Sequence, residues 1–272
     1  MKHRDLGDLD GDIVLFGGPY SNVQALEALF EWARDAGVTP DRMICTGDVV
    51  GYCGAAAACV EAVRASGCTL VAGNCEIQLA TDAADCGCGF SEGSVCDTLS
   101  SAWFTHARSE LNADQKAWLG GAHDVVTFNH GAKRYAVLHG GSTDVSRFIW
   151  ESDEEALFVR EWAALEKHTG PVDSIVAGHG GLPFLRLTAR GPWINTGVIG
   201  IPPNDGAPQT RFGFLSGGQL RIEHLTYDVD AAMRDMSDAG LPEACRTALK
   251  SGYWPSQDHL PESLRVAEAD KG

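Results

Sequence analysis

Four short polar clusters in this sequence each follow an apolar run, and each contains a side chain that can bind a metal ion. They supply one carboxylate, one amide and two imidazoles, from Asp48, Asn74, His139 and His179. Such a mixed set of nitrogen and oxygen donors suits Zn, Mn or Fe(II). A glycine stands beside each of these residues and lets the backbone turn sharply next to a ligand. The clusters therefore predict a site for a divalent transition metal.

Each of these residues also has an ordinary interpretation. Asp48 could cap a turn or a helix, and His139 or His179 could be a hydrogen-bonded histidine of the core. For any one residue alone, the ordinary interpretation would be favoured. The metal site is favoured because the four clusters each follow a separate predicted strand.

Patterns in the first 72 residues predict how the first two clusters are positioned. Three short apolar runs are typical of buried strands: residues 13–16, 42–45 and 69–72. Two segments between them have apolar side chains at helical spacing: residues 22–36 and 55–65. This β-α-β-α-β order predicts a parallel sheet with right-handed crossovers. Functional loops should then follow the carboxyl ends of the strands.

The rest of the chain predicts a more mixed arrangement. Residues 82–95 are small and rich in Gly and Cys, so we expect a loop there. Ser152 and Glu155 form a capping-box pattern that predicts the start of a helix. Other helices are predicted at residues 96–111, 112–119, 228–239 and 242–250. Other strands are predicted at residues 124–129, 133–138, 174–177, 185–189, 210–215 and 220–225, the first two as a hairpin.

Composition and charge limit the class of function. With 272 residues, 44% hydrophobic and 21% charged, the chain is typical of a globular protein. We expect one domain over residues 1–272, with a core of about 13–225 and a helical C-terminal extension of about 226–272. The net charge of −16 disfavours a nucleic-acid partner, because its phosphates would be repelled. No apolar run approaches the roughly 18 residues that cross a bilayer, and no signal-like segment is present, so we expect a cytoplasmic protein without a membrane partner.

Nine cysteines are many for a cytoplasmic chain. A framework of disulfides is typical of much shorter secreted chains, so we expect most of these thiols to be reduced. Three of them lie in apolar contexts and are predicted to be core residues: Cys45, Cys59 and Cys68. Four others lie close together along the chain: Cys75, Cys86, Cys88 and Cys96. Their spacing matches no standard zinc or iron–sulfur pattern, but a second metal site with thiolate ligands stays an alternative.

The order of the polar clusters resembles that of the calcineurin-like metallophosphoesterases, particularly the small bacterial phosphodiesterases. The matching motifs, in chain order, are "GD", "GN-x-E", "HG" and "GH", followed by "WINTG" at residues 193–197. The resemblance extends from about Ile13 to about Leu225. It implies an α/β fold, an αββα sandwich of two mixed sheets flanked by helices, which holds metal ions between strand-end loops and hydrolyses phosphate esters.

The chain departs from this family at the ligands of one metal ion. The first family motif, Asp-x-His-Gly-Asn, aligns with Gly18, Tyr20 and Asn22, so its Asp and His are missing. The last family motif, Gly-His-x-His, ends here in Gly181. The resemblance implies that the first metal is lost, with Tyr20 as a plug over its site. The second metal keeps its complete ligand set: Asp48, Asn74, His139 and His179.

Four more residues are candidates for the reaction itself. Cys75 stands where the family has its catalytic His, and it could be a metal ligand, a nucleophile or a bystander, with the ligand role favoured. Glu76 keeps the acidic residue that follows that His in the family. Asn22, from the first motif, and Arg147, the nearest cation past His139, are candidates for binding the substrate. Arg147 is equally a candidate for an ordinary surface residue.

Three functions fit these residues. The first is a divergent phosphoesterase that uses one divalent transition metal, Mn, Zn or Fe, to hydrolyse a phosphate mono- or diester of a small molecule. The second is a non-catalytic member of the family that binds a ligand or a protein in the remaining cleft. The third is a metal or redox protein based on the cysteines. The enzyme is favoured, with weak hydrolysis expected, because a metal ion and the His that protonates the leaving group are both missing.

Overall fold

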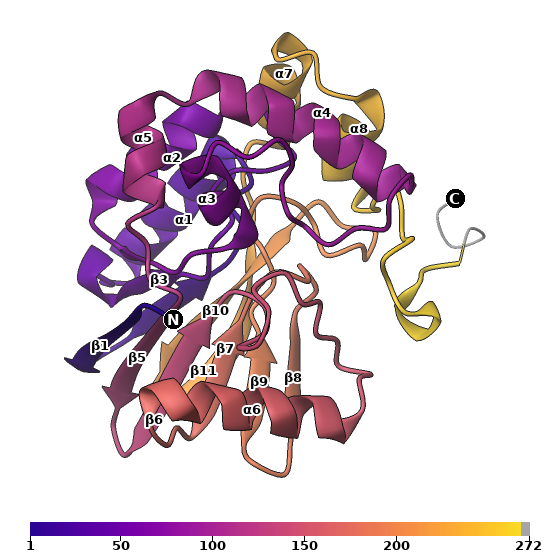
Figure 1. Cartoon of the computed structure of the whole chain (residues 1–272). Helices are drawn as coiled ribbons and strands as arrows, with labels where there is room; N and C mark the ends of the chain where they lie inside the picture. Colours follow the sequence, from indigo (N-terminus) through magenta and orange to yellow (C-terminus); the bar gives the residue numbers. More distant parts are fainter. Residues whose placement is uncertain (268–272) are drawn as a thin grey trace.

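Two β-sheets lie face to face at the centre of the molecule, and helices cover their outer faces (Figure 1). The structure is a computed structural model that describes residues 1–267. One sheet has five strands in the order β11 (Gln219–Leu225), β10 (Thr210–Ser216), β2 (Ile13–Phe16), β3 (Met43–Cys45) and β4 (Thr69–Leu70). The other has six, in the order β1 (His3–Asp8), β5 (Val125–His130), β6 (Lys133–Leu138), β7 (Ser174–Ala177), β9 (Pro192–Asn195) and β8 (Phe184–Leu187). Both sheets are mixed, with parallel and antiparallel neighbours.

The alternation of side chains along β2 shows how the two layers of core arise. Ile13 and Leu15 point into the core between the sheets, whereas Val14 and Phe16 belong to the core under the helices. Successive side chains of a strand point to opposite faces, so a strand that is apolar throughout must be covered on both sides. The apolar run at the start of the chain therefore requires a layer on each side of the sheet.

Most of the α-helices pack on the five-stranded sheet, and their buried side chains share its core. They are α1 (Val23–Asp35), α2 (Ala56–Ser66), α3 (Asn74–Ala80), α4 (Val95–Glu110), α5 (Ala113–Leu119), α7 (Val229–Asp238) and α8 (Glu243–Ser251). Helix α6 (Glu155–Thr169) covers the six-stranded sheet on the opposite side (Figure 1). Short 3-10 turns occur at Pro40–Arg42 and Glu262–Leu264. This arrangement confirms the predicted αββα sandwich.

Several local predictions were incomplete or wrong. Strand β1 was not predicted, because its sequence is mostly polar and it lies at the edge of its sheet. Helix α3 begins at Asn74, where a loop was expected. The helix start predicted from the capping-box pattern at Ser152 is wrong. Helix α6 begins at Glu155, and the residue before it, Glu154, makes no side-chain cap. The carboxylate of Asp153 instead accepts a hydrogen bond from the Trp150 N–H at 2.7 Å, which makes the residues before the helix a separate turn.

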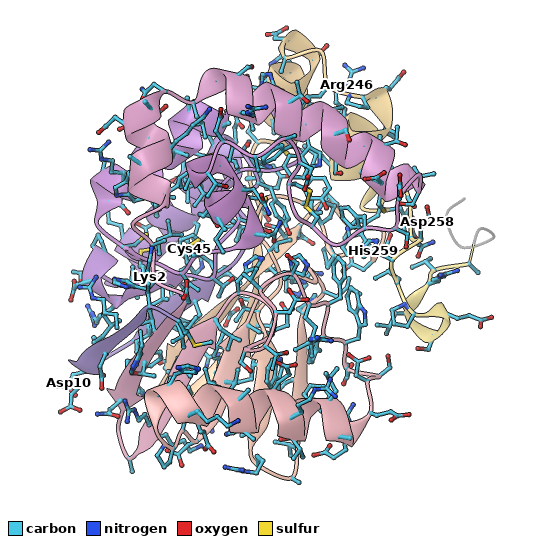
Figure 2. The ribbon with its side chains drawn as sticks, in the orientation of Figure 1. Lys2, Asp10, Cys45, Arg246, Asp258 and His259 are labelled. Carbon is cyan, nitrogen blue, oxygen red and sulfur yellow. A yellow bond between two sulfur atoms is a disulfide. The ribbon has the colours of Figure 1, made fainter. Side chains whose placement is uncertain are left out.

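The segment after α8 returns toward the carboxyl ends of the strands. The indole of Trp254 donates to the Pro202 carbonyl at 2.7 Å, and its backbone N–H donates to Asn204 at 2.8 Å. Asp258 and His259 lie beside the first turn of α4 (Figure 2). The predicted helices near residues 228–239 and 242–250 are thus followed by an ordered segment, residues 252–267, which we call the strap. In residues 1–267, no helix is long and apolar enough to cross a membrane. The prediction of one domain over residues 1–272 stays a prediction.

Candidate metal centre

The four predicted metal ligands come from both sheets and meet between them. Asp48 follows β3 and Asn74 opens α3 after β4, both on the five-stranded sheet. His139 follows β6 and His179 follows β7, both on the six-stranded sheet. All four side chains are buried. Four turns far apart in sequence thus converge, as the strand-end clusters predicted.

His139 is the centre of this group. Its Nε2 lies 3.1 Å from Asn74 Oδ1, 3.0 Å from His179 Nδ1 and 3.3 Å from Asp48 Oδ2. The ligand atoms of Asp48, His139 and His179 all lie within 4.8 Å of one another. Gly73 permits this approach, because a Cβ there would lie 2.5 Å from Asp48 Oδ1 and 2.8 Å from the His139 ring.

The hydrogen bonds behind these atoms show that a cation fits between them. His139 Nδ1 lies 2.7 Å from the Thr46 carbonyl, which can only accept, so Nδ1 carries the ring proton and Nε2 of the neutral ring offers a lone pair. The Asn74 amide donates to the Cys86 carbonyl at 2.9 Å, which turns its Oδ1 toward His139. A ligand His that donates its other N–H to a carbonyl is typical of metal sites. The lone pairs of His139 and Asn74 and the carboxylate of Asp48 therefore converge on one region, with a ring nitrogen of His179 beside them.

The pKa shifts of these residues also indicate that the group favours a positive charge. Burial alone would raise the pKa of Asp48, but the nearby His139 and His179 lower it below its ordinary value. Burial alone would lower the pKa of His139, but Asp48 and the Thr46 carbonyl raise it. Burial, together with His139, lowers the pKa of His179 to about 3. The raised pKa of His139 shows that the group favours a positive charge, which a bound divalent cation would supply.

Glu76 holds two of the ligand turns together from behind. Its carboxylate accepts hydrogen bonds from the backbone N–H groups of Asp48, Val49 and Gly73, each at 2.8 Å. Asp48 has a φ of 55°, a left-handed conformation that a residue other than glycine adopts only when its surroundings enforce it. Glu76 is fully buried, and burial followed by the neighbouring Asp48 raises its pKa. These contacts give it a positioning role, and its predicted catalytic role stays a prediction.

Cys75 lies at the edge of the ligand group. Its backbone N–H donates to Asp48 Oδ1 at 3.3 Å, and its thiol also faces that carboxylate. Burial and the charge of Asp48 raise the pKa of the thiol well above its ordinary value. Cys75 is not part of the group whose ligand atoms lie within 4.8 Å of one another. Its predicted role as a ligand stays a prediction.

The space of the missing ligands is filled by other side chains. A Cβ on Gly18 would lie 2.7 Å from both the ring of Tyr20 and Val198 Cγ1. The same ring packs against Gly51, where a Cβ would lie 2.7 Å from it, and only 5% of Tyr20 is exposed. Gly181 faces the indole of Trp254, 3.5 Å from the position of a Cβ. Tyr20 therefore has the position of a plug, and the C-terminal strap completes the filling.

The two predicted substrate-binding residues lie elsewhere. Asn22 is fully buried, and its side chain accepts from the Ala25 N–H at 3.0 Å and donates to the Gly200 carbonyl at 2.9 Å. It caps α1 and joins it to a distant loop. Arg147 lies 3.2 Å from the buried Glu161. Neither residue lines the pocket beside the metal ligands, so the structure does not bring them to the predicted site.

The cysteine cluster does not form a single metal site. Cys86 and Cys88 are joined by a disulfide, and the other cysteines are free thiols. The sulfur atoms of Cys75 and Cys88 lie 3.6 and 3.4 Å from the Asn74 amide, whereas Cys96 pairs with His259 Nδ1 at 3.4 Å. Among residues 1–267, no group of three metal-ligand side chains includes a cysteine.

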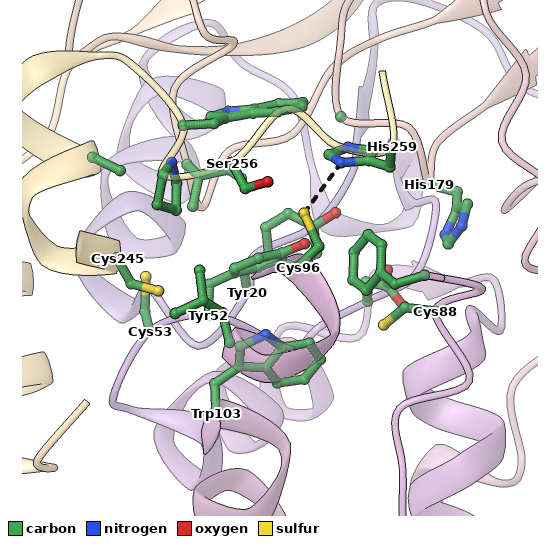
Figure 3. Close-up of a pocket in the computed structure, with 18 of the residues that line it drawn as sticks. Tyr20, Tyr52, Cys53, Cys88, Cys96, Trp103, His179, Cys245, Ser256 and His259 are labelled. Carbon is green, nitrogen blue, oxygen red and sulfur yellow. Dashed lines mark hydrogen bonds between the residues drawn. The ribbon is translucent and has the colours of Figure 1, made fainter. Parts of the chain in front are cut away.

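A pocket opens beside Asp48 and His179, and sequence reasoning missed most of its walls (Figure 3). The missed residues come from the loop before α4, the loop after β6 and the strap after α8; they include Phe90, Phe148, Trp254 and His259. The only signal in the sequence is a pair of aromatic-type side chains, Trp254 and His259, in a tail without a helical pattern.

The number of metal ions bound per chain tests the interpretation that only one complete ligand set is present. We expect the metal-free protein to bind one Mn²⁺ or Zn²⁺ ion per chain, because the position of the family's first metal lacks its ligands and is filled by Tyr20. Elemental analysis after purification and calorimetric titration measure this number. Two ions at adjacent positions would contradict the asymmetric site.

Acid sensitivity tests the packing of the strap. Burial lowers the pKa of His259 from 6.5 to about 4, so the unfolded chain takes up a proton that the folded chain resists between these values. Stability should therefore fall as the pH falls from 6.5 toward 4. His259→Phe, which keeps a ring against Trp254 and Phe148, should lose less stability over this interval. Thermal melts of the two proteins across this range make the comparison, and parallel curves would show that the imidazole is not buried in solution.

The chain is similar to known metallophosphoesterases in sequence and in fold. Residues 6–229 match the calcineurin-like phosphoesterase family. A metallophosphoesterase from Sphaerobacter thermophilus has a TM-score of 0.68 at 21% identity, with 90% of this chain and 100% of that chain covered. A hypothetical protein from Pyrococcus horikoshii OT3 has a TM-score of 0.73 at 15% identity, with the same coverage of 90% and 100%. No curated protein matches the chain. By its sequence and its fold, the chain belongs to the calcineurin-like phosphoesterase family.

Proposed function

We propose that this protein is a phosphoesterase that uses one divalent transition metal, Mn, Zn or Fe, to hydrolyse a phosphate mono- or diester of a small molecule. The observation that carries the proposal is the convergence of four buried donor side chains around His139 Nε2, next to an open pocket. Asp48, Asn74 and His139 are each oriented by a further hydrogen bond, as is typical of metal ligands.

The residues of the centre have separate tasks in this proposal. Asp48, Asn74, His139 and His179 would hold the ion, which when bound polarises a phosphoryl oxygen and lowers the pKa of a water. The Thr46 carbonyl keeps the Nδ1 proton of His139 in place, so that the lone pair of Nε2 remains available to the ion. Glu76 keeps the Asp48 turn in its left-handed conformation.

Slow turnover follows from the residue at position 75. A positioned acid that protonates the leaving group contributes about 10²–10⁴-fold to such reactions. The buried Cys75 thiol, with its raised pKa and its contact to Asp48, is a poor proton donor at neutral pH. The leaving group should then depart well only when it is itself a weak base.

We also propose a cytoplasmic location, because the cysteines outside the Cys86–Cys88 pair are free thiols.

Metal removal tests the proposal. Protein stripped of metal with a chelator should lose hydrolysis of aryl phosphate mono- and diesters, and adding Mn²⁺ or Zn²⁺ should restore it. Activity is expected to increase as the leaving group becomes more acidic, because no strong acid assists it. The measurement is the rate of phenol release for a series of substituted phenyl phosphates. Activity that persists without metal, or that is absent with every metal, would contradict the enzyme and favour a binding module.

A further inference from the structure

The pocket beside the metal ligands has walls that differ from those of a usual phosphate site. His179 stands at one end (Figure 3), where it belongs to the same ligand group as Asp48, and nearly all the other lining side chains are aromatic, aliphatic or sulfur-containing. The aromatic ones are Tyr20, Tyr52, Phe90, Trp103, Phe148 and Trp254. Of the residues in 1–267 that line the pocket, none is Lys or Arg.

We propose that this pocket binds the organic part of the substrate, and that the substrate is a phosphate ester of a small aromatic alcohol rather than a nucleotide or a polyphosphate. The inference rests on the proposed function and adds its substrate class. Three observations carry it: the two aromatic walls, the absence of cations among the described lining residues, and the small size of the cavity.

The rings of the pocket form two walls that reach the metal ligands. On one side, Tyr52 lies 4.8 Å from Tyr20 and 5.3 Å from Trp103, measured between ring centroids. On the other side, His259 stacks on Trp254 at 5.5 Å and lies 5.2 Å from Phe148. Figure 3 shows Tyr52 and Trp103 on the side of the pocket opposite His259. A planar group between these walls would find ring faces and edges on both sides.

Phe148 connects the second wall to the metal centre. Its ring lies 4.4 Å from the ring of His179, one of the proposed ligands. A phosphoryl group at the centre and a ring in the pocket would therefore be neighbours, with little space for a linker. This contact favours an ester whose phosphate is attached directly or through a short group to the ring.

Charge excludes ligands with several phosphates. The chain carries a net charge of −16, and the nearest predicted cation, Arg147, is held by the buried Glu161. The charge of a phosphate mono- or diester can be balanced by one divalent cation at the centre. Every further phosphate would lie among apolar side chains without a partner, which is costly in a buried site.

The cavity is also small. Its volume is about 60 Å³, less than the roughly 150 Å³ of a closed cavity that holds one benzene ring. A single small ring group would already fill it and extend into its opening, and a dinucleotide would lie mostly outside.

Cys96 offers a reporter that does not depend on turnover. It lines the pocket, its thiol lies 3.4 Å from His259 Nδ1, and it is the free cysteine among residues 1–267 that is not fully buried. A ring bound between the walls should shield it from alkylation.

The test uses full-length protein loaded with Zn²⁺ and ligands that cannot be hydrolysed, 1-naphthylmethylphosphonate and methylphosphonate. The naphthyl ligand should bind about tenfold tighter or more, because it buries its rings, and it should slow the reaction of Cys96 with iodoacetamide. Phe90→Ala removes one ring of the pocket and should reduce the difference between the ligands. Phe30→Ala, which changes a partly buried ring on α1 outside the pocket, should leave it unchanged.

The outcomes separate the two proposals. Equal affinities with no protection of Cys96, or tighter binding of tripolyphosphate than of the naphthyl ligand, would overturn the substrate class even if phosphate esters are hydrolysed. Tight naphthyl binding with protection of Cys96, but without hydrolysis of 1-naphthyl phosphate, would overturn the enzyme and keep the ligand class. Because the wild-type protein alone gives the affinities and the protection, the test does not depend on the folding of either variant.

Discussion

Asp48→Ala should abolish metal-dependent hydrolysis and weaken metal binding by at least about 100-fold, because losing only an outer partner of a ligand already costs about 10–100-fold. Asp48 is the one negatively charged side chain in the proposed ligand set, and the others are neutral donors. The turn should keep its shape, because the Glu76 carboxylate accepts a hydrogen bond from the backbone N–H of residue 48, which alanine retains. Calorimetric titration with Zn²⁺ and the rate of aryl phosphate hydrolysis measure the two effects.

Glu161→Gln is the matched control for this change. Glu161 is also a fully buried carboxylate, but it accepts from the Thr143 N–H and hydroxyl and lies beside Arg147, away from the ligands. Its replacement should leave the metal affinity unchanged. A second readout is the pKa of His139 in the metal-free protein, which Asp48 raises and which should fall in Asp48→Ala. Wild-type metal affinity in Asp48→Ala would mean that the ion binds elsewhere.

Glu76→Ala should lower the free energy of unfolding by about 3 kcal/mol or more, because it leaves three buried N–H donors without an acceptor at about 1–3 kcal/mol each. The donors are those of Asp48, Val49 and Gly73. Metal affinity should fall as well, since the Asp48 turn loses the contact that enforces its positive φ. Urea unfolding of the metal-free proteins, followed by metal titration under native conditions, measures both quantities.

The comparison with Glu161→Ala separates stability from positioning. That change also removes a buried acceptor of several hydrogen bonds, including one from a backbone N–H. It should therefore destabilise the protein while metal affinity stays as in the wild type. If Glu76→Ala unfolded at the wild-type urea concentration, or bound metal as tightly, the positioning role would be refuted.

The parts of the fold and of the centre that could be predicted share a local cause. Residues 13–16 are apolar without interruption, so the strand and its two covering layers follow from the pattern alone. Asp48 and His179 stand at turns between a strand and a loop, next to glycines, where a parallel sheet brings its functional loops together. These features depend on residues that are adjacent in the chain.

The parts that could not be predicted depend on partners far away in sequence. Asn22 matches a family motif, but a distant carbonyl, that of Gly200, takes its amide. Arg147 follows His139 closely in the sequence, yet its side chain lies beside the buried Glu161 on α6 and forms an ion pair with it. The strap with Trp254 and His259 has no periodic pattern, so its place over the pocket appears only in the folded chain. Helix α3 begins at Asn74 itself, so its first turn coincides with the polar cluster that was expected to be a loop.

The packing of Tyr20 makes the loss of the first ion hard to reverse in evolution. Gly18→Asp alone would place its Cβ 2.7 Å from the Tyr20 ring and from Val198, at a backbone φ of 40° that only glycine adopts without strain. Tyr20→His alone would leave a void among neighbouring glycines and gain no carboxylate partner. Because a Cβ on Gly18 would meet both Tyr20 and Val198, a lineage that returned to two ions would have to change these three residues nearly together. The packing around Tyr20 therefore opposes the return of the first ion, and selection on this chain can refine the chemistry of the remaining ion more readily than it can restore the lost one.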